Sequence, residues 1–225
     1  MVVKILDINQ LTHDVKSFVV EKPQGFTFTP GQATEVSINK SGWEEKKRPF
    51  TFTSLSGDKN LEFVIKGYPL DKYPKHGGVT EEMHKLVKGD ELIIDEAWGA
   101  IKYIGEGIFI AGGAGITPFI AIIRQLKSDQ KLKGNKLFFS NKEASDVILE
   151  SELKNAFGEY GVIFSLTREK KDGYENGRID KQFIKDRVKN FSQKFYVCGP
   201  KQMVKDVNMA LEELEVKPDF LVFEK

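Results

Sequence analysis

The sequence predicts a β-rich N-terminal domain followed by an α/β domain with a parallel sheet, and two observations support this fold class. Up to about residue 100, short runs of β-branched and aromatic residues are separated by turn signals such as Pro30-Gly31 and Ser41-Gly42. Beyond about residue 103, strand-like apolar runs alternate with helix-like segments, as in a sheet whose crossovers are helices. We therefore expect two domains, residues 1–102 and 103–225.

The N-terminal domain is expected to be an antiparallel barrel or sandwich. Its predicted strands, at 15–20, 34–38 and 61–65, are short and partly alternate between apolar and polar residues. One helix is expected over 80–87, because Thr80 is a good capping residue and acidic residues follow it in the first turn. Gly89 would end that helix.

The C-terminal domain is expected to be a parallel sheet with helices on both faces. Its elements alternate strictly along the chain. Strands are predicted at 108–111, 137–140, 162–166, 195–198 and 220–223, and helices at 118–126, 149–157, 181–188 and 202–214.

Composition excludes several classes of protein. The 225 residues include 34 Lys+Arg and 33 Asp+Glu, so no overall basic excess argues for nucleic acid or an anionic membrane as partner. No apolar run is long enough to cross a bilayer, and we expect no membrane insertion.

The few cysteines and histidines limit the chemistry further. The single cysteine, Cys198, cannot form an internal disulfide or hold an iron–sulfur cluster, and a cytoplasmic location is expected. His13, His76 and His84 lack metal-ligand spacing, so we expect no metal site and solvated or structural roles for all three. The same holds for the acidic pair at residues 95–96.

The segment "AGGAGITP" is a candidate phosphate site. It follows an apolar strand and precedes a helix, as a phosphate-binding loop requires. Gly112, Gly113 and Gly115 permit close approach of the backbone, and Pro118 suits the first turn of a helix. Pro118 replaces the third glycine of the dinucleotide fingerprint. A glycine-rich connection without a ligand is the alternative.

Two segments of the N-terminal domain are further candidates. In "KRPFTFTS", Arg48 has the planar fork that suits phosphate, and a strand would place Phe50 and Phe52 on one face. In "KHGGVTEEM", two glycines lead into the predicted helix, which is a second possible anion site. The alternatives are a barrel strand with a core aromatic face and ordinary helix capping.

Along nearly its whole length, the chain resembles the ferredoxin–NADP(+) reductase-like flavoprotein oxidoreductases. "RPFTFTS" is similar to their Arg-x-Tyr-Ser/Thr flavin motif, and "GGVT" to their flavin-pyrophosphate motif. "GGAGITP" resembles their nicotinamide-pyrophosphate loop, and "YVCGPKQMV" resembles their Cys-Gly-Pro motif. The segment "PGQ" at residues 30–32 also resembles a segment of that family. The resemblance implies a six-stranded antiparallel flavin-binding barrel before a parallel-sheet nicotinamide-binding domain.

The resemblance also implies site residues for FAD and for NADH or NADPH. Thr51, near the reactive flavin N5, and Cys198, beside the nicotinamide, are the residues expected next to the reacting atoms, with no covalent role for the thiol. The expected cofactor-binding residues are Arg48, Pro49, Phe50, Thr51, Ile65, Lys66, Tyr68, Gly77, Gly78, Val79, Thr80, Gly113, Gly115, Ile116, Thr117, Pro118, Cys198, Gly199, Pro200 and Phe223.

Two departures from the family pattern matter. Phe50 lacks the phenol of the usual tyrosine, which removes one hydrogen bond but not ring stacking. Many relatives end with an aromatic residue that shields the flavin, whereas here Glu224-Lys225 ends the chain and Phe223 would serve only if its strand shifts.

The implied activity is hydride transfer from NAD(P)H to FAD, and then electron transfer to a separate acceptor such as a ferredoxin, a flavodoxin or a haem protein. The alternatives are a free-flavin or metal-chelate reductase, and a non-catalytic electron-transfer or regulatory subunit. Residues 141–153 resemble the NADH-using branches, with an asparagine at the strand end and an aspartate before the helix. Lys142 and Arg168 are possible ligands for the 2′-phosphate of NADPH.

Overall fold

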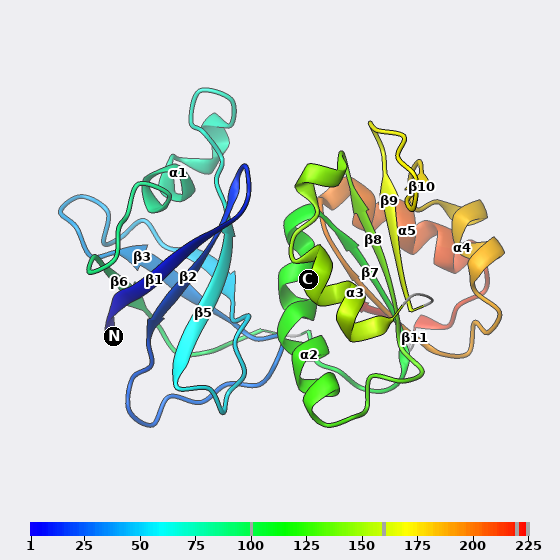
Figure 1. Cartoon of the computed structure of the whole chain (residues 1–225), viewed down its shortest axis with the longest axis horizontal. Coiled ribbons are helices and arrows are strands. Elements are labelled where there is room, and N and C mark those ends of the chain that lie inside the picture. The colour runs from blue at the N-terminus through cyan, green and yellow to red at the C-terminus, as the bar shows by residue number, and fades with distance from the viewer. Residues whose placement is uncertain (100, 159–160, 219–220, 224–225) are drawn as a thin grey trace. The chain divides into compact units, whose positions relative to one another are not determined.

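The structure is a computed structural model that describes residues 1–99, 101–158, 161–218 and 221–223. Residues 222 and 223 are described by their backbone only. The chain divides into two compact units, Met1–Gly99 and Ala100–Lys225 (Figure 1). No described helix combines the length and the apolar character that crossing a membrane requires.

The N-terminal unit is a six-stranded antiparallel barrel, as expected. Its strand order is β4-β3-β6-β1-β2-β5. The barrel closes where Phe52, just after β4, bridges Phe63 of β5 and the Thr53 amide donates to the Glu62 carbonyl at 2.9 Å. The strands are β1 (Val2–Thr12), β2 (Val15–Glu21), β3 (Ala33–Ile38), β4 (Arg48–Thr51), β5 (Asn60–Lys66) and β6 (Glu91–Ile94).

Aromatic rings fill the barrel. Phe52 stacks on Phe28 with centroids 4.3 Å apart, and it also contacts Phe26 and Phe63 at 5.6 and 5.2 Å. Burying each such side chain contributes about 1.5–3 kcal/mol. The tight cluster therefore makes a stable base for β4 and β5, the strands that carry the expected site residues.

The helix of this unit is shorter than the sequence predicts. Helix α1 spans Val79–Met83 and follows a 3₁₀ turn, η1 (Pro74–His76). The residue before its first turn is Gly78, in the left-handed conformation, so the expectation that Thr80 caps the helix is wrong. Thr80 lies inside the helix, where its hydroxyl accepts the Tyr68 amide at 3.1 Å instead. That bond ties the helix to the segment following β5.

The C-terminal unit is a parallel sheet with strand order β10-β9-β8-β7-β11-β12. Alternation along β7 explains its two helical layers (Figure 1). Ile108 and Ile110 pack in the cluster that α4 (Lys181–Arg187) and α5 (Lys201–Glu213) cover, whereas Phe109 contacts Phe119 of α2 (Thr117–Ser128) on the other face. The strands are β7 (Gly107–Gly112), β8 (Lys136–Asn141), β9 (Val162–Leu166), β10 (Glu175–Asn176), β11 (Lys194–Cys198) and β12 (Leu221–Phe223).

The predicted helices of this unit are present, with boundaries within about two residues of those expected. The first follows a 3₁₀ turn, η2 (Gly113–Ile116), and a further turn, η3 (Ala144–Asp146), precedes the second. The helices are α2 (Thr117–Ser128), α3 (Glu150–Phe157), α4 (Lys181–Arg187) and α5 (Lys201–Glu213).

Candidate cofactor sites

The two anion motifs predicted in the barrel lie side by side. Arg48 begins β4, and its guanidinium donates to the carbonyls of Lys47, at 2.7 Å, and His76, at 3.1 Å. A methyl group added to Gly77 would lie 3.1 Å from the same guanidinium. Segments about 28 residues apart in sequence therefore converge on one cation, as a phosphate site needs.

No carboxylate of the described residues neutralises the charge of Arg48. Within the described ranges of the chain, its hydrogen bonds go to carbonyl oxygens, and no carboxylate forms an ion pair with it. Carbonyl dipoles orient a guanidinium without cancelling its charge, so the cation keeps its affinity for an anion. The residues present thus fit a bound pyrophosphate.

Strand β4 divides its aromatic residues between two roles. Phe52 is fully buried in the barrel core, whereas Phe50 rests against that core and stays half exposed. The threonines divide likewise: Thr53 is buried and its hydroxyl bonds to Glu62, but the hydroxyl of the half-buried Thr51 has no hydrogen-bond partner among the described residues. Phe50 and Thr51 are therefore the pair available to a flat ring.

The segment after β5 packs its aromatic rings together and contacts Arg48 through the His76 carbonyl. The Tyr68 ring stacks on the His76 ring with centroids 4.1 Å apart, and Tyr73 packs edge-on against both. Burial raises the pKa of the Tyr68 hydroxyl, which stays neutral at physiological pH. The Leu70 amide donates to the Glu81 carboxylate at 2.8 Å, which holds the segment against α1.

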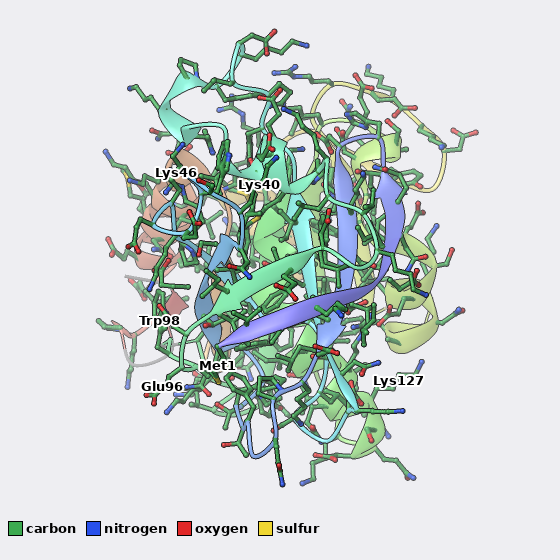
Figure 2. All side chains as sticks on the ribbon, turned by 90° about the vertical axis from the view of Figure 1, so that its left-hand side faces the viewer. Met1, Lys40, Lys46, Glu96, Trp98 and Lys127 are labelled. Carbon is green, nitrogen blue, oxygen red and sulfur yellow. The ribbon has the colours of Figure 1, made fainter. Side chains whose placement is uncertain are left out.

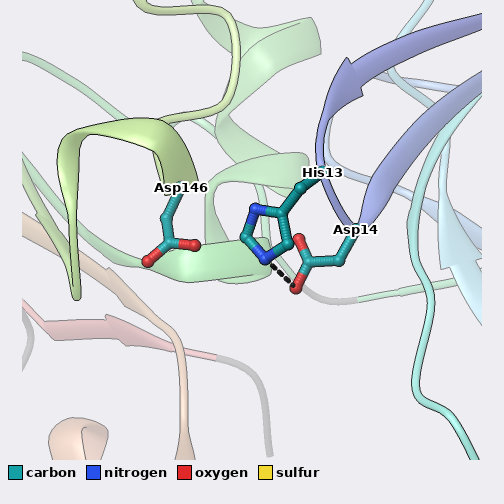
Figure 3. A group of neighbouring side chains, drawn as sticks. All are labelled: His13, Asp14 and Asp146. Carbon is teal, nitrogen blue, oxygen red and sulfur yellow. Dashed lines mark ion pairs between the residues drawn. The ribbon is translucent and has the colours of Figure 1, made fainter.

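Two expected flavin residues of this region are engaged within the protein. The Lys66 ammonium pairs with Asp14 at 2.6 Å, and Asp14 also pairs with His13 at 3.5 Å (Figure 3). Val79 is buried among core side chains. In this conformation the side chain of Val79 faces the core, which leaves its main chain to meet a ligand.

The connection between β3 and β4 borders the same place, which sequence reasoning missed. Trp43 and Leu70 both lie within 4 Å of a methyl group added to Gly78, at 3.8 and 3.7 Å. Lys40 and Lys46, both on this connection, are labelled in Figure 2. The Lys46 ammonium lies over the Trp43 ring at 4.0 Å, and Lys40 pairs with Glu82 of α1 at 2.9 Å. A tryptophan in a turn of lysines and glutamates carries no sequence signal for this position.

In the C-terminal unit, the glycine loop and the Cys-Gly-Pro segment meet at the carboxyl ends of β7 and β11. A methyl group on Gly115 would lie 2.5 Å from both the Cys198 carbonyl oxygen and the Gly199 Cα. Gly113 differs, because it has φ +51° and no heavy atom within 4 Å of its side-chain position. Packing therefore explains Gly115, whereas Gly113 leaves an open backbone face for a phosphate.

Other predicted residues of this loop serve the fold first. Ile116 is fully buried and Pro118 lies in the first turn of α2, as expected. The Thr117 hydroxyl donates to the Ala114 carbonyl at 3.1 Å. Cys198 is buried at the end of β11, and Pro200 precedes α5 and accepts the Val204 amide at 3.0 Å. The side chain of Phe223 lies outside the described residues, as do Glu224 and Lys225.

A buried amide marks the neighbouring strand end. Asn141, the last residue of β8, is only 6% exposed, and neither its amide nitrogen nor its amide oxygen has a partner within the described structure. Buried polar groups are normally hydrogen-bonded, so this side chain is a candidate contact for a polar ligand. The Arg168 amide donates to the Lys142 carbonyl at 2.9 Å, which brings two exposed cations beside it.

Comparison with known proteins matches each unit to a cofactor-binding domain family. The family described as "FAD-binding domain" matches residues 1–99, and the one described as "Oxidoreductase NAD-binding domain" matches residues 109–209. NADH-cytochrome b5 reductase 2 of Mycosarcoma maydis is 27% identical over 90% of this chain and 62% of its own length. NADH-cytochrome b5 reductase 3 of Rattus norvegicus is 27% identical over 89% and 78%. The chain thus spans under two thirds of the length of the first of these relatives.

Solved structures share the fold at low identity. The flavohem-like FAD/NAD binding domain of nitric oxide dioxygenase from Vibrio cholerae superposes with a TM-score of 0.88 at 19% identity, over 99% of this chain and 97% of that one. The ferredoxin NADP+ reductase from Neisseria gonorrhoeae, with bound FAD and NADP, gives 0.81 at 20% identity, over 100% and 97%. In this chain an FAD-binding domain is thus followed directly by an oxidoreductase NAD-binding domain, and the fold is that of the ferredoxin–NADP(+) reductase-like flavoproteins.

Proposed function

We propose that this protein is an NAD(P)H-dependent flavoprotein reductase that passes electrons to a separate redox protein. The barrel residues described above would hold FAD, which would supply acceptance of a hydride from the reduced nicotinamide and release of electrons one at a time. The observation that carries the proposal is the environment of Arg48. Two carbonyls orient its guanidinium beside Gly77, and no carboxylate of the described residues pairs with it.

The roles proposed for the residues of the barrel follow from which atoms of each residue remain available to a ligand. Arg48 binds the flavin pyrophosphate, with the Gly78–Thr80 main chain beside it. Phe50 presents a half-exposed ring to the flavin, and the Thr51 hydroxyl donates near N5. Ile65, Lys66 and Tyr68 border the remaining edge, Lys66 chiefly by its main chain because its ammonium pairs with Asp14.

The roles proposed for the C-terminal residues are those of positioning. The open face of Gly113 and the start of α2 at Thr117 receive the pyrophosphate of NAD(P)H. Cys198, Gly199 and Pro200 border the nicotinamide. The buried side-chain amide of Asn141 would form hydrogen bonds with the adenosine part of the dinucleotide. Orientation of the nicotinamide is the main catalytic contribution asked of this domain.

The domain boundary, the compartment and the acceptor belong to the same proposal. The proposed boundary at residues 102/103 lies between the two family matches and three residues after the division of the two compact units. The lone cysteine supports a reducing, cytoplasmic location. Cytochrome b5 appears in the names of several relatives, so a small haem protein is the first acceptor to test.

An anaerobic spectral titration tests the proposal. The purified protein, supplied with FAD, is mixed with NADH or NADPH, and the visible flavin band is recorded. Bleaching of the band, followed by recovery when oxidised cytochrome b5 is added, is the expected result. A bound band that neither nucleotide bleaches would contradict the reductase activity. A flavin that dissociates on gel filtration would instead favour a free-flavin reductase.

A further inference from the structure

His84 links the two chain segments that carry the proposed flavin residues of the barrel. It follows the last turn of α1, and its Nε2 lies 2.9 Å from the Ile65 carbonyl oxygen of β5. The same helix is joined to the segment after β5 by the bond from the Tyr68 amide to the Thr80 hydroxyl. The ring of His84 and the hydroxyl of Thr80 are therefore two clamps between α1 and the end of β5.

The ring fits closely into its place. A methyl group on Gly67 would lie 2.9 Å from His84 Nδ1 and 3.0 Å from Cε1, so the ring lies against a backbone that has no side chain. Phe18 approaches with its centroid at 6.1 Å. The Lys16 ammonium of β2 donates to the His84 carbonyl at 2.7 Å, which holds the end of the helix as well.

The surroundings favour the uncharged ring. Because Ile65 offers a carbonyl oxygen, Nε2 must carry the proton, and Nδ1 is then the unprotonated nitrogen. Burial lowers the pKa of His84 from its usual value, and the nearby Lys16 charge lowers it further. The bond to Ile65 and the Asp14 carboxylate, itself paired with Lys66, act in the opposite direction but do not prevail.

We propose that His84 is a positioning residue for the flavin: its neutral ring holds α1 against the end of β5, and protonation loosens the flavin site. This inference rests on the proposed function. His84 would take no direct part in hydride transfer, because its ring contacts the protein backbone and not the reacting atoms. It concerns how tightly FAD is retained.

The sign of the pH effect follows from linkage. A histidine whose folded pKa lies below its unfolded value of about 6.5 binds fewer protons in the folded, clamped state. The clamped state therefore has its full stability above pH 6.5 and loses stability as the pH falls through the range below 6.5. FAD affinity is expected to fall in the same range.

The test measures the FAD dissociation constant by flavin fluorescence between pH 5.5 and 8, for the full chain and three variants. His84→Leu removes the bond and is expected to weaken FAD binding about 5–10-fold at pH 8. His84→Gln retains an N–H donor but does not titrate, so it should bind within about twofold of the unaltered protein at pH 8. His13→Gln, a change of the exposed histidine beside Asp14, is the matched control.

The pH profile separates a positioning role from a merely structural one. The unaltered protein and His13→Gln should both bind FAD more weakly below pH 6.5, whereas His84→Gln should lose that decline. An unchanged decline in His84→Gln, or unaltered FAD affinity in a folded His84→Leu, would overturn the inference while the proposed function stands. Failure of the unaltered protein to bind FAD at any pH would overturn both.

Discussion

Two glycines of one loop should respond to alanine in opposite ways, since one is required by packing and the other faces open space. In Gly115→Ala, the new methyl would lie 2.5 Å from backbone atoms of Cys198 and Gly199, against an ordinary contact of 3.4 Å or more. The strand ends must then separate by about 1 Å. In Gly113→Ala, no heavy atom lies within 4 Å of the methyl.

The magnitudes follow from these two geometries. Overpacking against backbone costs about 1–3 kcal/mol, and a protein of this size loses about 2–4 °C of Tm per kcal/mol, so Gly115→Ala should melt about 2–12 °C lower. Gly113→Ala carries only left-handed strain of about 1 kcal/mol at φ +51°. Its methyl instead occupies the face proposed for the pyrophosphate, and KM for NAD(P)H should rise at least about tenfold.

Thermal melts without nucleotide and stopped-flow reduction of the flavin would separate the two effects. Gly25→Ala is the control for backbone strain, because Gly25 also has a positive φ, +76°, and open surroundings. It lies in a turn of the N-terminal unit and not in the glycine loop. Gly25→Ala should match Gly113→Ala in Tm and the unaltered protein in KM. A Gly115→Ala protein that melts within 1 °C of the unaltered one, on the scale set above, would refute the packing argument. An unchanged KM in Gly113→Ala would show that the phosphates lie elsewhere.

Three further outcomes are expected. Arg48→Gln should weaken FAD binding about 10–100-fold in a fluorescence titration, since a charged hydrogen bond contributes about 1.5–3 kcal/mol, while Arg48→Lys should lose less; equal affinity in all three proteins would remove Arg48 from the phosphate site. Exchanging Lys142 and Arg168 together for alanine should raise KM for NADPH more than KM for NADH, because only NADPH has the 2′-phosphate; parallel changes would contradict this. FAD should quench the emission of Trp43, which lies near Gly78, so quenching should persist in Trp98→Phe and vanish in Trp43→Phe. Quenching that survives in Trp43→Phe would place FAD away from that ring.

The order of elements was largely predictable, and the misses have physical reasons. Buried alternation makes the strands near 108–111 and 137–140 evident. Strand β1 was missed because, after Val3 and Ile5, most of its residues up to Gln10 are exposed or half-exposed and polar positions interrupt the pattern. The helix predicted over 80–87 stops at Met83, since the chain turns back there and Gly89 bonds to the Ile5 carbonyl of β1.

The order of the two domains and the short segments proposed to contact phosphate were predictable from the sequence alone, because glycine spacing, an arginine at the start of a strand and strand–helix alternation are local properties. Which of those residues are available to a ligand follows from the folded chain. Folding assigns Gly115 to packing and Gly113 to open space, orients Arg48 on a carbonyl 28 residues away, and leaves the amide of Asn141 buried without a partner among the described residues. Such distinctions depend on contacts between distant segments, and those contacts exist only once the chain has folded.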